Sequence, residues 1–142
     1  MPSPYKTSSI ANGEPPRSLS YGVWPVSKTF TVTTALAVND LIEMFEVPEG
    51  ATALDWIFSS EDLDTNGTPT IVMDVGDDTV SGRFISGSTI GQGGGLERVT
   101  THAGHAYKFP ADTVVKIKVT TGPATGATGV SVTLTAFLTM DP

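Results

Sequence analysis

The sequence predicts an all-β fold, a jelly-roll-like sandwich or barrel of about eight strands with an extended N-terminal arm. Three observations predict this class. Charged residues make up only 16% of the 142 residues, and threonine, valine and glycine are plentiful where good helix formers are few. Short segments of alternating apolar and polar residues recur about every 8–12 residues. Glycines and turn-forming dipeptides separate these segments, which leaves no long stretch with helical periodicity.

Residues 1–27 are expected to form the arm. Five of the ten prolines lie in this segment, and proline fixes φ and removes a backbone donor, so extended or polyproline conformations are favoured. The segment is also aromatic, which a purely solvated tail would not be. Two interpretations stay open: the arm packs on its own domain, or it reaches a neighbouring subunit.

In the second interpretation, the arm contacts its partner through aromatic anchors and basic side chains. Tyr5, Tyr21 and Trp24 are the expected anchors, because aromatic residues are enriched at protein interfaces. Lys6 and Arg17 are expected to pair with acidic neighbours.

Residues 28–142 are expected to form one β-domain. A jelly roll is the first choice, because eight strands in two sheets fit this length. The alternation predicts strands at 28–34, 41–47, 52–59, 70–75, 80–85, 97–101, 105–109, 112–120 and 130–139.

The last predicted strand shows the clearest alternation. Apolar residues from Val130 to Leu138 share one face, and serine and threonine occupy the other. Phe137 is the exception, because it falls on the polar face. An apolar side chain there indicates a covered surface, and Phe137 is therefore a candidate subunit contact.

The charge of the chain limits its partners. The formal net charge is −7 and the pI is near 4.5, whereas a nucleic-acid-binding protein needs an excess of lysine and arginine. Lys6, Arg17 and Lys28 against Glu14 give residues 1–28 a net charge of +2, which leaves −9 for the rest. No apolar run approaches the length of a membrane helix, and the N-terminus lacks the basic-then-apolar layout of a signal peptide. We expect neither nucleic acid nor membrane as a partner.

One acidic loop resembles the start of a calcium-binding loop. Asp62, Asp64, Asn66 and Gly67 have the required spacing. The position that needs a bidentate glutamate is Met73, however, and no helices flank the loop. A turn stabilised by aspartate and asparagine side chains is the expected alternative.

The other candidate motifs are incomplete. His102 and His105 fall on opposite faces of a strand and lack a third metal ligand. The glycine run at 91–95 lacks the lysine and the helix of a phosphate loop, so it predicts flexibility or close backbone packing. There is no cysteine and no recognisable serine–histidine pair. We therefore expect no catalytic residue, metal or cofactor.

Several segments, in their order and spacing, resemble the head decoration (cement) proteins of tailed bacteriophages. The resemblance covers residues 36–139 and excludes the arm. The segments are Leu36–Ala51, Leu63–Pro69, Asp74–Asp77, Arg83–Thr89 and Thr121–Gly126, the last before a final alternating strand.

The resemblance implies a structural virion protein, made in the cytoplasm of a bacterial host, that binds the outside of a capsid. Its expected partners are the major capsid protein and itself, as a homotrimer or alternatively a dimer. The acidity agrees with the outer face, because the inner face meets packaged DNA. A carbohydrate- or receptor-binding β-sandwich of a phage fibre or spike is the alternative from another class, and a small enzyme is a third.

Overall fold

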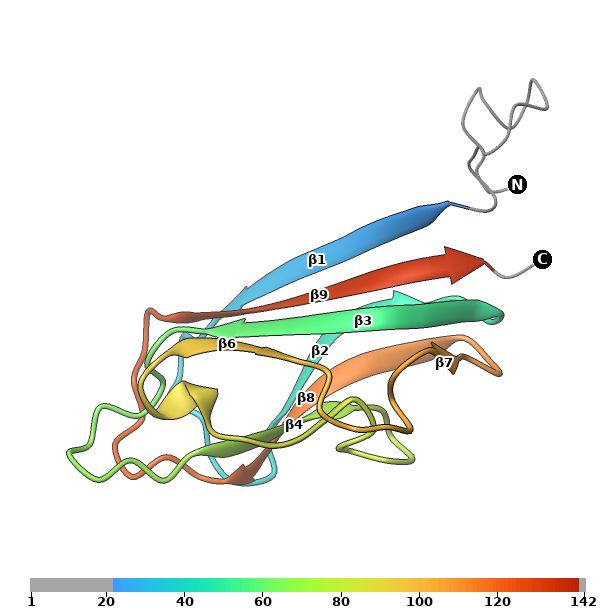
Figure 1. Ribbon diagram of the computed structural model, residues 1–142. Coiled ribbons are helices and arrows are strands. Elements are labelled where there is room, and N and C mark those ends of the chain that lie inside the picture. Colours follow the sequence, from blue (N-terminus) through green and yellow to red (C-terminus); the bar gives the residue numbers. More distant parts are fainter. Residues whose placement is uncertain (1–21, 141–142) are drawn as a thin grey trace.

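The computed structural model describes residues 22–140, which form two antiparallel sheets packed face to face (Figure 1). Sheet A has the order β1-β9-β3-β6, and β7 also pairs with β3; sheet B has the order β2-β8-β4-β5. The elements are β1 (Val23–Thr31), β2 (Leu41–Val47), β3 (Ala51–Ser60), β4 (Val72–Gly76), β5 (Ile85–Ser88), η1 (Ile90–Gln92), β6 (Gly95–Arg98), β7 (Tyr107–Lys108), β8 (Thr113–Thr121) and β9 (Ser131–Met140).

The chain crosses repeatedly between the two sheets. The first three strands alternate between sheets A and B, and the last two, β8 and β9, lie in different sheets. The final strand β9 is inserted between β1 and β3, so the first and last described strands are neighbours (Figure 1). This arrangement confirms the expected all-β sandwich.

An aromatic stack fills the core between the sheets. Trp56 of β3 is fully buried and stacks on Phe84 with ring centroids 4.2 Å apart. Phe45 lies parallel to Trp56 on another side at 6.2 Å, and Phe109 packs against Phe84 at 5.8 Å. These rings come from four distant segments, so their burial ties both sheets and two loops into one core.

The first strand begins earlier than the sequence predicts. β1 starts at Val23 rather than at residue 28, and it pairs with β9 along its whole length. Pro25 argued against a strand there, because proline cannot donate to a sheet ladder. β1 lies at the edge of sheet A, where one side of the strand has no neighbour and proline is tolerated.

The position predicted for the fifth strand is also wrong. The strand expected at 80–85 is β5, which begins only at Ile85. Asp77 forms a turn instead, because its carboxylate accepts the backbone N–H groups of Thr79 and Val80. The turn brings Val80 so close to Gly76 that a Cβ there would lie 2.3 Å from the Val80 carbonyl oxygen.

Candidate interaction surface

The outer face of sheet A along β1 and β9 carries no charged side chain. Residues directly opposite one another on paired strands share a face, and the register of these strands pairs Val23 with Thr139 and Thr31 with Ser131. We call this surface the neutral face. It consists of Val23, Pro25, Ser27, Thr29, Thr31, Ser131, Thr133, Thr135, Phe137 and Thr139.

Hydroxyl groups bond across the two strands over most of the neutral face. Ser27 and Thr135 are 2.9 Å apart, and Thr29 and Thr133 are 2.8 Å apart. Thr31 and Ser131 form a third pair at 3.3 Å. The six hydroxyl groups of these three pairs thus have protein partners, which lowers the cost of removing this part of the surface from water.

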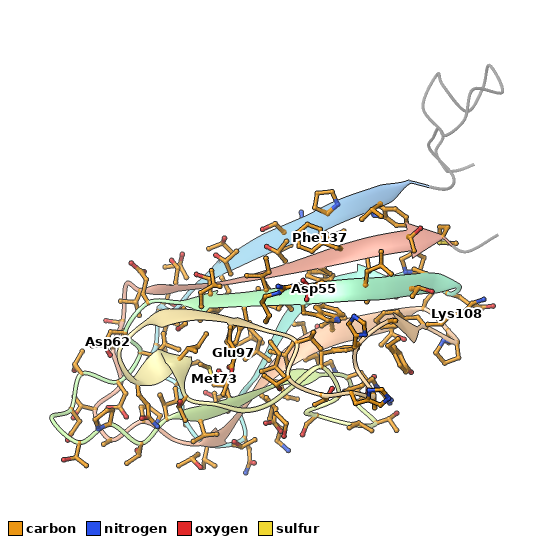
Figure 2. All side chains as sticks on the ribbon, in the orientation of Figure 1. Asp55, Asp62, Met73, Glu97, Lys108 and Phe137 are labelled. Carbon is orange, nitrogen blue, oxygen red and sulfur yellow. The ribbon has the colours of Figure 1, made fainter. Side chains whose placement is uncertain are left out.

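The other end of the neutral face is apolar. Phe137 lies opposite Pro25 on β1 and opposite Asp55 on β3, and Val23 is 56% exposed nearby in the same row. Figure 2 labels Phe137 on β9, on the upper side of sheet A. The alternation of buried and half-buried residues along β9 confirms that Phe137 points away from the core.

The outer face of sheet B has the opposite character. Its register places Glu43 opposite Lys116, and Asp74 opposite Lys118. Lys116 forms an ion pair with Asp78 and lies 3.6 Å from Glu43. The hydrogen bond from Lys116 to Asp78 raises the pKa of the lysine. Sheet B therefore presents a charged surface, as a solvated face normally does.

The acidic loop after β3 is stabilised by backbone donors. Asp64 is buried, and its carboxylate accepts N–H groups from Thr70 and Ile71 of its own loop. It also accepts those of Ala124 and Thr125, about 60 residues further along the chain. Burial raises the pKa of Asp64, but these hydrogen bonds outweigh burial and hold the pKa well below its usual value.

This geometry favours the turn over the calcium site. Asn66 N–H donates to Asp64, and Asp62 accepts the N–H of Asp64. The carboxylate oxygens of Asp64 thus already have donors, and Met73 lies in the hydrophobic core. Within residues 22–140, no three histidine, cysteine or acidic side chains are grouped as metal ligands.

A pocket of about 620 Å³ opens beside Asp77. Arg83 donates to Asp77 at 2.6 Å, and its guanidinium lies 4.5 Å above the ring of Tyr107. Burial raises the pKa of Asp77, but the hydrogen bond and charge of Arg83 together with the backbone N–H groups of Val80 and Thr79 outweigh burial, and the pKa is lowered. Lys116, the other basic residue of the lining, pairs with acidic groups as described above. Both cations of this pocket are therefore neutralised within the protein.

The histidines and the glycine run are placed in loops. His102 and His105 are exposed in a turn, so the strand expected at 105–109 is reduced to the two residues of β7. Gly91 is buried in the short helix η1, and a Cβ there would lie 2.8 Å from Met73 Cε. The glycine run thus serves close packing at Gly91, one of the two roles expected for it. The helix itself was not predicted.

The candidate contact residues of the arm are only partly visible. Tyr5, Lys6, Arg17 and Tyr21 lie outside the described residues. Trp24 lies on β1, half-buried, and packs against the hydrophobic core from the inner side of sheet A. Within the part of the chain that the structure covers, no helix is long and apolar enough to span a membrane.

Comparison with known proteins identifies the class to which this fold belongs. No family model matches the chain, and no match is found among curated proteins. Among solved structures, a chain from the capsid of Ralstonia phage GP4 is similar over 90% of both chains, with 31% identity and a TM-score of 0.79. The chain belongs to a family of bacteriophage capsid proteins.

Two further structures support this assignment to different degrees. A chain in the capsid asymmetric unit of cyanophage Pam1 matches with 28% identity and a TM-score of 0.78, over 98% of this capsid protein and 99% of that chain. A chain from the acid-stable capsid of Helicobacter pylori bacteriophage KHP30 has 13% identity and a TM-score of 0.61, over 84% and 89%. The KHP30 chain shows only that the fold is shared.

Proposed function

We propose that this capsid protein decorates the outer surface of a phage head and cements adjacent major capsid protein subunits. The observation that carries the proposal is the similarity to a chain of the GP4 capsid over nine-tenths of both chains. The neighbours are components of capsids, so a structural role in the virion is favoured over an enzymatic one.

Charge supports the outer surface. The protein has a net charge of −7, and three of the six basic residues in the described part of the chain, Arg83, Arg98 and Lys116, are paired with carboxylates. A surface of this kind repels packaged DNA and is compatible with the outside of the shell.

Cementing works by mass action. A protein that binds the assembled shell better than free capsid subunits stabilises the shell by RT ln(1 + [L]/Kd) for each site. At a concentration 100 times Kd, this amounts to about 2.7 kcal/mol for each bound copy. Because many copies bind one head, a modest affinity for each site produces a large total stabilisation.

The test uses shells assembled from the major capsid protein of the same phage. We expect these shells to form without this protein, to bind it when it is added, and then to withstand higher temperature. Cosedimentation measures binding, and light scattering during heating measures disruption of the shells. Equal melting of bare and decorated shells contradicts cementing. Failure of shells to form without the protein makes it an integral shell component instead.

We further propose that the protein acts on the capsid as a homo-oligomer, either a trimer at local threefold positions or a dimer at twofold positions. A reconstruction of the decorated head tests this directly. Isolated monomers on the shell contradict it.

The arm is proposed to lie across an adjacent subunit, with Tyr5 and Tyr21 as anchors, Lys6 and Arg17 as ionic contacts, and Trp24 at its base. Deletion of residues 1–21 removes the part of the expected arm that precedes β1 and keeps all of β1. We expect this variant to fold and to bind capsids more weakly. Binding at full affinity contradicts a role for the arm, and unfolding assigns the arm to its own domain.

A further inference from the structure

We infer that the neutral face is the surface through which one copy of this protein contacts a second copy. The inference rests on the homo-oligomer of the proposed function, and it names the surface that mediates it. Three properties of the described residues carry the argument: absence of charge, internally satisfied hydroxyl groups, and an exposed apolar end.

The absence of charge on the neutral face favours a second copy of the same chain as the partner. Two copies of a chain with net charge −7 repel each other wherever their carboxylates approach. Residues 29–142 hold fourteen acidic and five basic residues, yet none of them lies in the outward rows of β1 and β9. Interface centres are depleted of charged residues. Like-charged copies can therefore approach closely at the neutral face.

The carboxylates nearest this face already have partners. Asp55, opposite Phe137, forms an ion pair with Arg98. Glu61, beyond the end of β3, accepts the backbone N–H of Ser131 at 2.7 Å. These groups lie at the rim of the surface and add little repulsion to a contact centred on β1 and β9.

The contact is made by the face rather than by the free edge of β1. Pro25 lies on this edge strand and removes one backbone donor, which weakens pairing with a strand from another molecule. The neutral face instead offers Phe137, Pro25 and Val23 for apolar contact, and hydroxyl pairs that need no new partner.

The size of the face sets the expected strength. The two strands β1 and β9, paired over nine residues each, give a surface about 30 Å by 10 Å, or on the order of 300 Å² for each copy. Stable complexes bury about 800 Å² for each partner. We therefore expect weak association in solution, which the high local concentration on a capsid reinforces.

Sedimentation equilibrium of the full chain tests the inference. We expect the average mass to rise above 14.8 kDa between about 10 μM and 1 mM protein, a range matched to a small interface. We also expect stronger association at high salt, because salt screens repulsion between acidic copies. Dimers and trimers both support the inference.

The diagnostic variant is Thr29→Asp, which places a carboxylate at the centre of the neutral face. Thr29 is exposed, so the variant should fold, and we expect at least about a tenfold lower association constant. The matched control is Leu41→Asp on the outer face of sheet B, where the replaced side chain is 54% exposed. We expect the control to associate like the original protein. The Phe137→Asp variant provides a second test at the apolar end of the face. Its association is interpreted only if circular dichroism shows that the variant is folded.

Three results overturn the inference. One is an original protein that stays monomeric over the whole concentration range. Another is an equal effect of Thr29→Asp and Leu41→Asp. The third is a monomer whose capsid binding is lost in Thr29→Asp alone, which assigns the face to the capsid protein instead. Capsid binding by the original protein is measured separately, so failure of the proposed function is distinguishable from failure of this inference.

Discussion

Asp64 and Asp77 lie at opposite ends of β4, and the protein holds them in different ways. Asp64 is surrounded by backbone N–H donors from its own loop and from residues 124–125. Asp77 accepts two backbone N–H groups of its own turn and the side chain of Arg83. Asp64 thus joins two distant segments of the chain, whereas Asp77 closes one local turn. Acidic side chains of this protein therefore stabilise its loops through hydrogen bonds, in addition to giving the surface its negative charge.

The largest effect is expected from Asp64→Ala. Removing the carboxylate leaves the N–H groups of Thr70, Ala124 and Thr125 without their acceptor in a buried site, and unpaired buried donors are costly. We expect the melting temperature to fall by roughly 10 °C or more. Differential scanning calorimetry measures it. A fall of only a few degrees would show that the two loops hold together without Asp64.

Low pH should also weaken the hydrogen bonds to Asp64 and Asp77, but by less than the Asp64→Ala substitution does at Asp64. The pKa values of Asp64 and Asp77 are both lowered in the folded protein, so folding is favoured by their ionised forms. Their contribution is fully present above the unfolded pKa of about 3.9, and it is lost as pH falls through the folded values. A protonated carboxyl group still accepts hydrogen bonds, so the loss is smaller than in Asp64→Ala. Urea denaturation at stepwise lower pH measures it, and flat stability below pH ~4 argues against the prediction.

The Asp77→Ala substitution should destabilise the protein less than Asp64→Ala does, because it affects one local turn. The substitution leaves Arg83 without its partner, but Arg83 keeps its position above Tyr107 and the turn remains near solvent. We expect a loss of about 1–2 kcal/mol in the free energy of unfolding, measured with urea. A loss as large as that of Asp64→Ala would mean that the local turn is as important as the link between distant loops.

The smallest effect is expected from Arg98→Ala. The Arg98 side chain is 70% exposed in its ion pair with Asp55, and exposed pairs contribute less than about 1 kcal/mol. Urea denaturation should barely distinguish this variant from the original protein. A clear loss of stability would show that this pair is coupled to the register of β3 and β6.

The structure agrees best with the sequence where side chains alternate. β2 matches its predicted bounds, and β9 differs from its predicted bounds by one residue at each end. Phe137 lies outside the core as predicted, because strand geometry fixes the face of every residue once one face is buried. The start of β1 was missed because the neighbour that makes Pro25 acceptable is β9, more than 100 residues away.

Among the candidate sites, local turns were predictable and long-range contacts were not. The sequence Asp62–Asn66 indicated an aspartate-rich turn, and Asp64 forms one. Nothing in that segment indicates that Ala124 and Thr125 complete the site. The pairing of Ser27 and Thr29 with β9 was equally hidden, although the alternation of 28–34 predicted a polar face there.

The sequence by itself determined the all-β class, the acidic character, the resemblance to phage head proteins and the outward position of Phe137. The class, the acidity and the position of Phe137 follow from composition and from the two-residue period of a strand, which act within a few neighbouring residues. The resemblance rests instead on the order and spacing of short segments. The tertiary structure alone decided which strands are neighbours, which distant backbone N–H groups donate to Asp64, and that one sheet face is neutral while the other is charged. Such features need contacts between segments 60 to 108 residues apart, and these form only when the whole sandwich closes.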